Sequence, residues 1–353
     1  MEDAKSTDII KCTNCNASMR FSIKDHALKC PHCGHVQQIE KGNDNLVRRE
    51  ITNSALTEHE PWIENVIFRC NFCNADIDAD KNGIMKKCPF CGNPNILRTE
   101  EIPGIKPDSL IPYTVTKESA LDLFRKWIHS KIYAPGKCRR SATAENISSV
   151  YSPVWSFTAR TQSRYNGVLG EDYTETHTDS KGNTYTTTHT RWYHVSGNIS
   201  ADYTDVFIPS GKLIPKKMAH KLEPYPMKKA VGYRQEYLAD RAAEHYSRDL
   251  NTCFNEFKSY VYSDLCQRIK RKYGADHIRE MNIDTNYVTK YFNYILLPNY
   301  IANFWYKEKN YNFYVNGATG EVVGRYPISA WKVMFTAAAV TAAIILIADF
   351  LWS

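Results

Sequence analysis

One apolar run in the chain is long enough to span a membrane. Residues 333–352 read VMFTAAAVTAAIILIADFLW, and Asp349 is the single ionisable residue among them. Twenty helical residues rise about 1.5 Å each and span about 30 Å, the thickness of a bilayer's hydrocarbon core. Trp331 and Trp352 flank the run, as tryptophans do at membrane interfaces. The pattern predicts a transmembrane helix over 333–352; the alternative is a helix buried in a soluble core.

The charges around this run predict its orientation. Arg325 and Lys332 lie on its N-terminal side, and positive flanks stay in the cytosol. Asp349 would then lie near the distal headgroups, where a carboxylate costs little. The first residues, MEDAKSTDIIKC, are polar and charged and do not resemble a secretory signal. We therefore expect a single-pass, tail-anchored protein of the cell membrane, with residues 1–332 in the cytoplasm.

Two stretches of the central region have helical periodicity. Thr116 is suited to cap a helix that begins at Lys117 and stops before Pro135. Its apolar positions recur at helical spacing, at Leu121, Phe124, Ile128 and Ile132. A second pattern runs from Glu236 to Tyr273, with the stripe Leu250, Phe254, Phe257, Tyr260, Val261 and Leu265.

Aromatic, extended segments precede and follow these helical stretches. The sequence Asp179-Ser-Lys-Gly-Asn183 predicts a hairpin turn between the arms TETHT and TYTTTHT. The arms are rich in threonine on both faces, so we expect this hairpin to project from the core. His177 and His189 lie in it, but no cysteine or carboxylate spacing indicates a metal there. Residues 113–327 are thus predicted to form an α+β domain.

The N-terminal hundred residues carry a duplicated cysteine pattern. Two C-x2-C steps separated by fourteen residues occur first at Cys12, Cys15, Cys30 and Cys33. The same spacing recurs 58 residues later at Cys70, Cys73, Cys88 and Cys91. Both second steps read Cys-Pro-x-Cys-Gly, in which Gly34 and Gly92 supply the positive φ that aims backbone N–H groups at sulfur. This pattern is typical of four-thiolate metal sites.

These cysteines predict two structural Zn²⁺ ions, because paired thiols in a reducing compartment bind metal more often than they form disulfides. An iron site of rubredoxin type and free thiols are the alternatives. The chain is therefore expected to be multidomain: two small antiparallel zinc ribbons, an α+β domain and one transmembrane helix. The boundaries are ribbon 1 at 1–40, a linker at 41–64, ribbon 2 at 65–101, a linker at 102–112, the α+β domain at 113–327 and the helix at 333–352.

The charge distribution bears on whether the protein binds nucleic acid. Residues 1–100 hold 13 Lys and Arg against 14 Asp and Glu, so the net charge of +7 comes from the rest of the chain. Thiolate-bound zinc would make the ribbons more acidic, which disfavours nucleic acid as their partner. A weak candidate for phosphate contact is the basic helix end, Arg268, Lys270, Arg271 and Lys272. No nucleophile, metalloprotease or nucleotide-binding motif is present, so we expect no enzyme.

A wider resemblance rests on motifs beyond the cysteines. They are the YxPxW segment at Tyr151–Trp155, LLPxY at Leu296–Tyr300 and YxFxVNGxTGEVVGxxP at Tyr311–Pro327. Together with the CPxCG steps they resemble a family of bacterial membrane proteins with tandem TFIIB-type zinc ribbons, often labelled primosomal or phage replication proteins. The chain departs from that pattern at Asn299-Tyr300, where Val-Trp is usual, and at Ala318, where Gln is usual.

The resemblance implies a function as well as a fold. Such proteins are similar to the ribbon protein that accompanies PspA-like and flotillin-like (SPFH) proteins in membrane-stress gene sets. We expect a non-enzymatic, membrane-tethered adaptor that recruits a cytosolic protein, of SPFH or PspA type, to the inner face of the membrane. The alternative is a zinc-ribbon nucleic-acid-binding protein linked to DNA replication.

Overall fold

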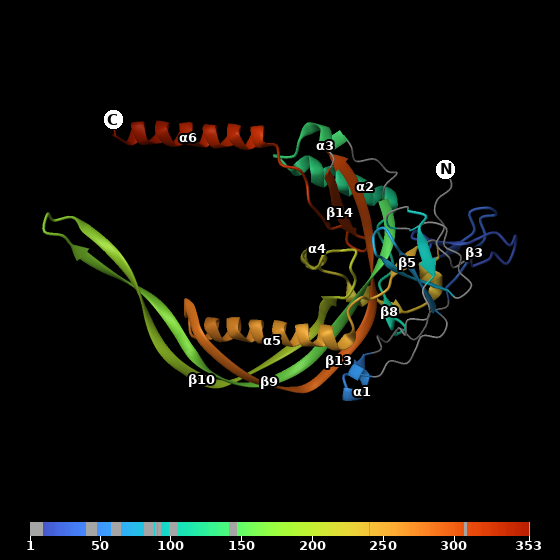
Figure 1. Cartoon of the computed structure of the whole chain (residues 1–353), viewed down its shortest axis with the longest axis horizontal. Helices are drawn as coiled ribbons and strands as arrows, with labels where there is room; N and C mark the ends of the chain where they lie inside the picture. The colour runs from blue at the N-terminus through green and yellow to red at the C-terminus, as the bar shows by residue number, and fades with distance from the viewer. Residues whose placement is uncertain are drawn as a thin grey trace.

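The computed structural model describes residues 10–39, 48–57, 65–80, 88, 90, 93–98, 105–140, 147–239, 241–306 and 309–352. These residues form small N-terminal β-structures that carry cysteine clusters, a larger domain of helices and strands, and a C-terminal apolar helix (Figure 1). The predicted fold class agrees with the structure in this outline.

Three long antiparallel strands form the frame of the larger domain. They are β9 (Ile147–Thr178), β10 (Thr184–Pro209) and β13 (His277–Tyr306), with β9 between the other two. At mid-length, Thr161 lies opposite Ala201 on one side and Tyr287 on the other. Figure 1 shows the strands as one curved ribbon from which the β9–β10 hairpin projects. The predicted turn and its projection are confirmed.

Helix α5 (Leu250–Lys272) lies in the concave side of this ribbon (Figure 1). Every second residue of β9 from Phe157 to Leu169 is buried, while the residues between them are exposed or half-buried. Burial therefore follows the two-residue period of the strand. The Phe157 and Phe257 rings stack across the strand–helix interface with centroids 5.1 Å apart. This contact fixes α5 against the sheet.

The predicted helix from 236 to 273 is wrong in its first half. Residues Gln235–Leu238 form the 3₁₀ turn η3, and Ala242–Glu244 form strand β12, which pairs with β9. Strand pairing satisfies the backbone there, and Asp249 begins α5 by accepting a hydrogen bond from the N–H of Thr252 at 2.7 Å. Tyr260 was also placed on the buried stripe, but it is 48% exposed.

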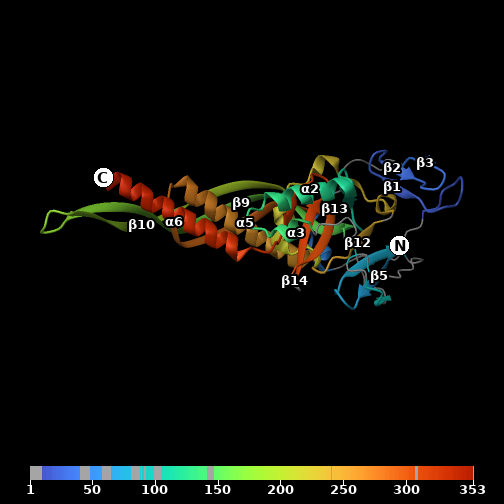
Figure 2. The same ribbon diagram turned by 90° about the horizontal axis from the view of Figure 1, so that it is seen from above.

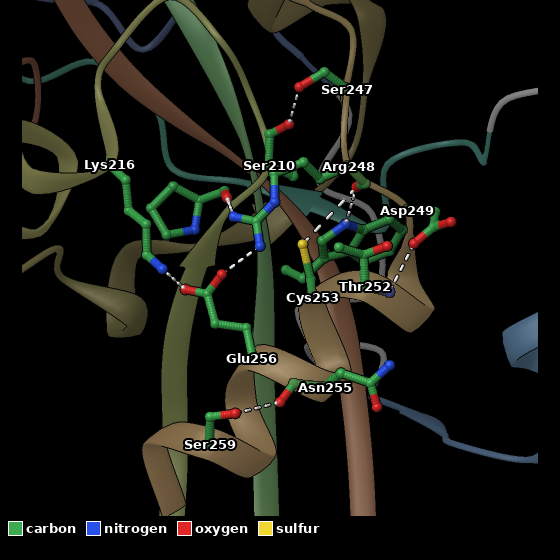
Figure 3. A network of polar contacts seen from close by, with 12 residues as sticks. Ser210, Lys216, Ser247, Arg248, Asp249, Thr252, Cys253, Asn255, Glu256 and Ser259 are labelled. Carbon is green, nitrogen blue, oxygen red and sulfur yellow. Dashed lines mark hydrogen bonds and ion pairs between the residues drawn. The ribbon is translucent and has the colours of Figure 1, made fainter. Parts of the chain in front are cut away.

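Polar contacts hold the start of α5 to the end of β10 (Figure 3). The Arg248 guanidinium donates to the carbonyl of Pro209 at 3.0 Å and forms an ion pair with Glu256. Lys216 pairs with the same carboxylate. These two cations hold the pKa of Glu256 below its ordinary value, although burial opposes them. The helix start is thus anchored by a charge cluster.

A second packing unit covers the other end of the sheet. Helix α2 (Lys117–Ser130) begins at Thr116, whose hydroxyl accepts from the N–H of Ser119, as predicted. Phe124 stacks on Phe313 of β14 (Lys309–Asn316). Three of the four predicted apolar positions are buried, but Ile132 lies beyond the helix and is 70% exposed. The short hairpin of β14 with β15 (Val322–Gly324) closes the unit.

The described parts of both predicted linkers pair with the main sheet. Strand β4 (Arg49–Glu50) pairs with β13, and the short helix α1 (Asn53–Thr57) follows it. Strand β8 (Ser109–Leu110) lies between β13 and β11 (Val231–Gly232). The chain between the cysteine regions and the main domain is therefore held to the sheet at these points.

The C-terminal helix α6 (Ala330–Trp352) carries the apolar run. It is long and apolar enough to cross a membrane, and none of its spanning window is buried against the rest of the protein. Its start is attached to the loop after α2, where Lys332 Nζ donates to the carbonyls of Ile132 and Ala134 at 2.9 Å each. Figures 1 and 2 both place α6 and the hairpin tip at one end of the molecule and the cysteine regions at the other.

The second cysteine region joins the main sheet through strand pairing. Strand β6 (Asp76–Asp80) pairs with β12, which also pairs with β9. Asp78 accepts a hydrogen bond from the buried His245 at 2.8 Å. Although burial lowers the pKa of His245, the charge of Asp78 raises it above its ordinary value. The region is thus held by backbone bonds and a buried ion pair.

Glu244 of β12 is a buried carboxylate beside this strand pairing. It is 2% exposed, one carboxylate oxygen accepts from the N–H groups of Lys212 and Leu213, and the other oxygen has no partner among the described residues. Burial raises its pKa to about 7, and the charge of Asp76 acts in the same direction. The folded protein therefore binds a proton here that the unfolded chain releases above its ordinary pKa of 4.5.

We predict that Glu244→Gln is stabilising relative to the parent at high pH. Because the folded pKa is raised, the parent loses stability as pH rises from 4.5 to 7, up to about 3 kcal/mol. Glutamine resembles the protonated acid and avoids this loss. Denaturant unfolding at pH 5, 6, 7 and 8 should show a difference between the two proteins that grows to pH 7 and then levels off. A constant difference, or the same trend in the exposed Glu321→Gln, would contradict the assignment.

Candidate metal centres

The first cysteine cluster is built on a three-stranded sheet. Its strands are β1 (Arg20–Ser22), β2 (Ala27–Lys29) and β3 (Val36–Gln37). A tight turn follows each of Cys12 and Cys30, closed by N–H bonds from Asn16 and Gly34 to their carbonyls.

Both turns of this cluster need a residue with positive φ. Gly34 has φ of 75°, as the sequence predicts, and Asn16 takes the same role in the first turn with φ of 56°. Asparagine tolerates this conformation better than most residues. The two turns therefore have matching geometry although only one contains glycine.

The four sulfur atoms of the first cluster converge on one point. Cys12 Sγ lies 3.6 Å from Cys33 Sγ, and Cys15 Sγ lies 3.4 Å from Cys30 Sγ. A disulfide would need about 2.05 Å. The edge of a tetrahedron with metal–sulfur bonds of about 2.3 Å is about 3.8 Å. All four sulfurs lie within 4.8 Å of one another, so they fit the coordination of one ion by four thiolates at the corners of a tetrahedron.

Backbone N–H groups favour the thiolate form of two of these cysteines, Cys30 and Cys33. The N–H of His35 lowers the pKa of Cys33 to about 6. The N–H of Cys33 lowers the pKa of Cys30, against the opposing effect of burial. His32 and His35 are exposed and stand outside the sulfur cluster. The sulfurs thus provide the ligand set without a histidine.

The first cluster rests on the main domain through aromatic contacts. The Phe21 ring of β1 lies 5.2 Å from the ring of Tyr237 in η3. The Arg241 guanidinium lies over Phe21 at 5.2 Å and over Tyr113 at 4.8 Å. The module is therefore packed against the segment that precedes β12.

The second cluster repeats the first at the edge of the large sheet. Its strands are β5 (Asn65–Cys70), β6 and β7 (Ile96–Arg98). Cys70, Cys73 and Cys88 have converging sulfurs, with 3.7 Å between Cys73 and Cys88. Asn74 has φ of 55°, which matches Asn16 in the first cluster. Cys91, the fourth predicted ligand, lies outside the described residues.

The basic end of α5 is largely occupied by the protein's own side chains. Arg268 donates to Asp264 at 2.6 Å, and Lys272 donates to the hydroxyl of Tyr165 at 3.1 Å. Arg271 donates to the carbonyl of Gln267 at 3.3 Å. Lys270 lies on the same helical turn and is half-buried. The bond from Lys272 to Tyr165 joins α5 to β9, and the other two contacts lie within the helix.

The structure also places a carboxylate, Glu175, beside the two hairpin histidines. Glu175, His177 and His189 form a further group whose ligand atoms lie within 4.8 Å of one another. The carboxylate was missed because its proximity depends on strand register. The register follows from the turn, since residue pairs counted outward from it place Thr187 opposite Glu175. That pairing puts Glu175 on the same face of the hairpin as both histidines.

No protein-family model matches this chain, and no solved structure matches it. It is 26% identical over 327 residues to the uncharacterized protein YdjG of Bacillus subtilis (strain 168), a match that covers 92% of this chain and 91% of that protein. The TFIIB-type, primosomal and SPFH associations thus receive no support from these comparisons.

We predict that the full chain, purified in detergent without added metal, carries two tightly bound ions. Cys15→Ser should reduce the metal content from two to one per chain, because it removes one corner of the first tetrahedron. Elemental analysis measures this directly. The control is Cys266→Ala, a buried cysteine of α5 outside both clusters, which should retain both ions. Metal-free parent protein would contradict the assignment.

Proposed function

We propose that this protein is a membrane-tethered, non-enzymatic adaptor whose two zinc-bearing modules recruit a cytosolic protein to the inner face of the membrane. The observation that carries the proposal is that the apolar helix and the cysteine modules lie at opposite ends of the molecule. An exposed apolar helix lies at one end and two cysteine modules lie at the other, and the large sheet, which includes the second module at its edge, lies between them. Such a shape is suited to hold a binding surface away from a bilayer.

The membrane end of the proposal rests on α6. Four of its apolar side chains, Phe335, Ile344, Leu346 and Phe350, are each more than 60% exposed. A helix with this much exposed apolar area needs a partner, and a bilayer matches its length and composition. Lys332 at its start is consistent with a cytoplasmic main domain.

Zinc is the ion we assign to the two cysteine clusters. Four thiolates in a tetrahedron are preferred by zinc and by iron–sulfur centres. A filled four-thiolate shell leaves no position for a catalytic water, so the role we assign to the ion is structural. Each module buries few apolar side chains, and we infer that metal binding supplies much of its folding free energy.

A protein partner is favoured by exposed apolar side chains on the second module. Phe72, between two of its cysteines, is 71% exposed, and Leu97 on β7 is 55% exposed. Both side chains are therefore available for contact with a protein partner. Each four-thiolate zinc centre would add a charge of about −2, which opposes phosphate binding. The resemblance of the sequence suggests an SPFH-type or PspA-type partner.

The competing candidate is a nucleic-acid-binding role linked to replication. Exposed aromatic rings such as Phe72 also stack on bases. However, residues 1–100 carry no excess of basic side chains, and the basic end of α5 is engaged within the protein. Electrostatic contact with phosphates is the main source of such binding. We therefore rank this candidate second.

We predict that deleting residues 333–353 moves the protein from the membrane fraction to the soluble fraction, because α6 is the proposed anchor. Fractionation after a high-salt wash measures the shift. The matched control replaces Lys332 with Gln and keeps the apolar run, and it should leave the protein in the membrane. A truncated protein that still sediments with membranes would contradict anchoring by α6 alone.

We predict that the double variant Phe72→Ala/Leu97→Ala loses crosslinked capture of its cytosolic partner while keeping both ions. Neither residue is a ligand, so folding of the module should be preserved. The control is Ile132→Ala, an exposed apolar residue outside the cysteine modules. Salt-sensitive binding of the full chain to DNA or RNA at micromolar affinity would overturn the adaptor role in favour of the competing candidate.

A further inference from the structure

The register of the β9–β10 hairpin sorts its side chains onto two faces. Tyr173 pairs with His189, Glu175 with Thr187 and His177 with Tyr185. Residues two apart lie on the same face of a strand. These six side chains therefore share one face, and the other face carries the threonine pairs Thr174–Thr188, Thr176–Thr186 and Thr178–Thr184.

On the first face, two imidazoles and a carboxylate point at a common position. Glu175 Oε2 lies 3.8 Å from His177 Nε2 and 4.0 Å from His189 Nε2. The hydroxyl of Thr187 lies between the rings, 3.0 Å from the first Nε2 and 3.1 Å from the second. Both rings therefore present the same nitrogen atom toward the carboxylate.

These distances are close to those of a filled metal site. Bonds of about 2.1 Å from an ion to imidazole and carboxylate separate neighbouring ligands by about 3.0–3.4 Å. The two separations from the carboxylate need to shorten by about 1 Å or less, and the side chains of Glu175, His177 and His189 are 42–49% exposed. The site could therefore close around an ion without moving the backbone.

Core packing does not account for this convergence. From Glu171 to Thr178 and from Thr184 to Trp192 no residue is buried. The imidazoles instead lie beside tyrosine rings, His177 at 5.4 Å from Tyr185 and His189 at 5.7 Å from Tyr173. Each imidazole thus has a tyrosine ring beside it on the same face of the hairpin.

From this geometry we propose that Glu175, His177 and His189 form a third metal site, which binds one divalent first-row transition ion such as Zn²⁺. Imidazole nitrogen and carboxylate oxygen are ligands that suit these ions, and Mg²⁺ and Ca²⁺ prefer all-oxygen sites. Three protein ligands leave positions for water or for a group from another molecule. The site differs from the cysteine clusters in having no sulfur and in being open to solvent.

The test counts ions above those that the protein already holds. Full-length protein in detergent, as purified, is equilibrated with increasing ZnCl₂, and bound zinc is measured after dialysis at pH 7.5. One additional saturable equivalent is expected. The double variant His177→Gln/His189→Gln should lose it, and Glu175→Gln should weaken it at least tenfold. All three residues lie on a projecting hairpin whose arms bury no residue, so these variants should fold.

The matched control is His194→Gln, which removes an exposed histidine from the same strand and should keep the additional equivalent. MgCl₂ added at a concentration equal to that of ZnCl₂ should not displace the additional zinc. Absence of a saturable additional equivalent in the parent would overturn the proposal. Retention of that equivalent by the double histidine variant would overturn it as well, because the ion would then lie elsewhere.

Discussion

The backbone ladder between β9 and β13 is the interaction on which the rest of the structure depends. It runs from the pair Ile147–Ala302 at one end to Gly170–His277 at the other. Hydrogen bonding along so long a pair fixes the two strands as one body. Strand β10 adds to β9 on one side, and β14, β8 and β4 add to β13 on the other. Each later element takes its position from this ladder.

The two faces of the ladder differ in burial: one packs against α5 and the other is exposed. Buried residues of β9 such as Phe157 and Tyr165 face α5, and their burial provides the hydrophobic stabilisation of this half of the domain. The residues between them, such as Arg160 and Arg164, are exposed on the convex face. Beyond Gly170, where β13 no longer pairs with β9, the burial ends and the hairpin becomes polar on both faces. The point at which β13 stops pairing with β9 therefore separates the buried part of the sheet from the projecting hairpin.

Sequence reasoning found the features that depend on short spacing. The cap at Thr116, the turn at 179–183, the apolar tail and the cysteine steps each occupy a few residues and follow local rules. The start of α5 was misplaced because Ala242–Glu244 pair with strands distant in sequence, and no local signal marks such pairing. The carboxylate beside His177 and His189 was missed for the same reason, since it depends on register.

The proposed membrane anchor places a constraint on the hairpin. Both lie at the same end of the molecule (Figures 1 and 2). A polar hairpin whose strand β10 pairs with β9 alone among the described strands has an open edge, and unpaired backbone groups are not tolerated in hydrocarbon. In a bilayer, α6 must therefore turn away from the hairpin. The turn would occur in the segment 325–329, and it would break the bonds from Lys332 to the loop after α2. The bond to Ile132 is exposed and the bond to Ala134 is partly buried, and since a hydrogen bond contributes about 1 kcal/mol net, water can replace both at small cost.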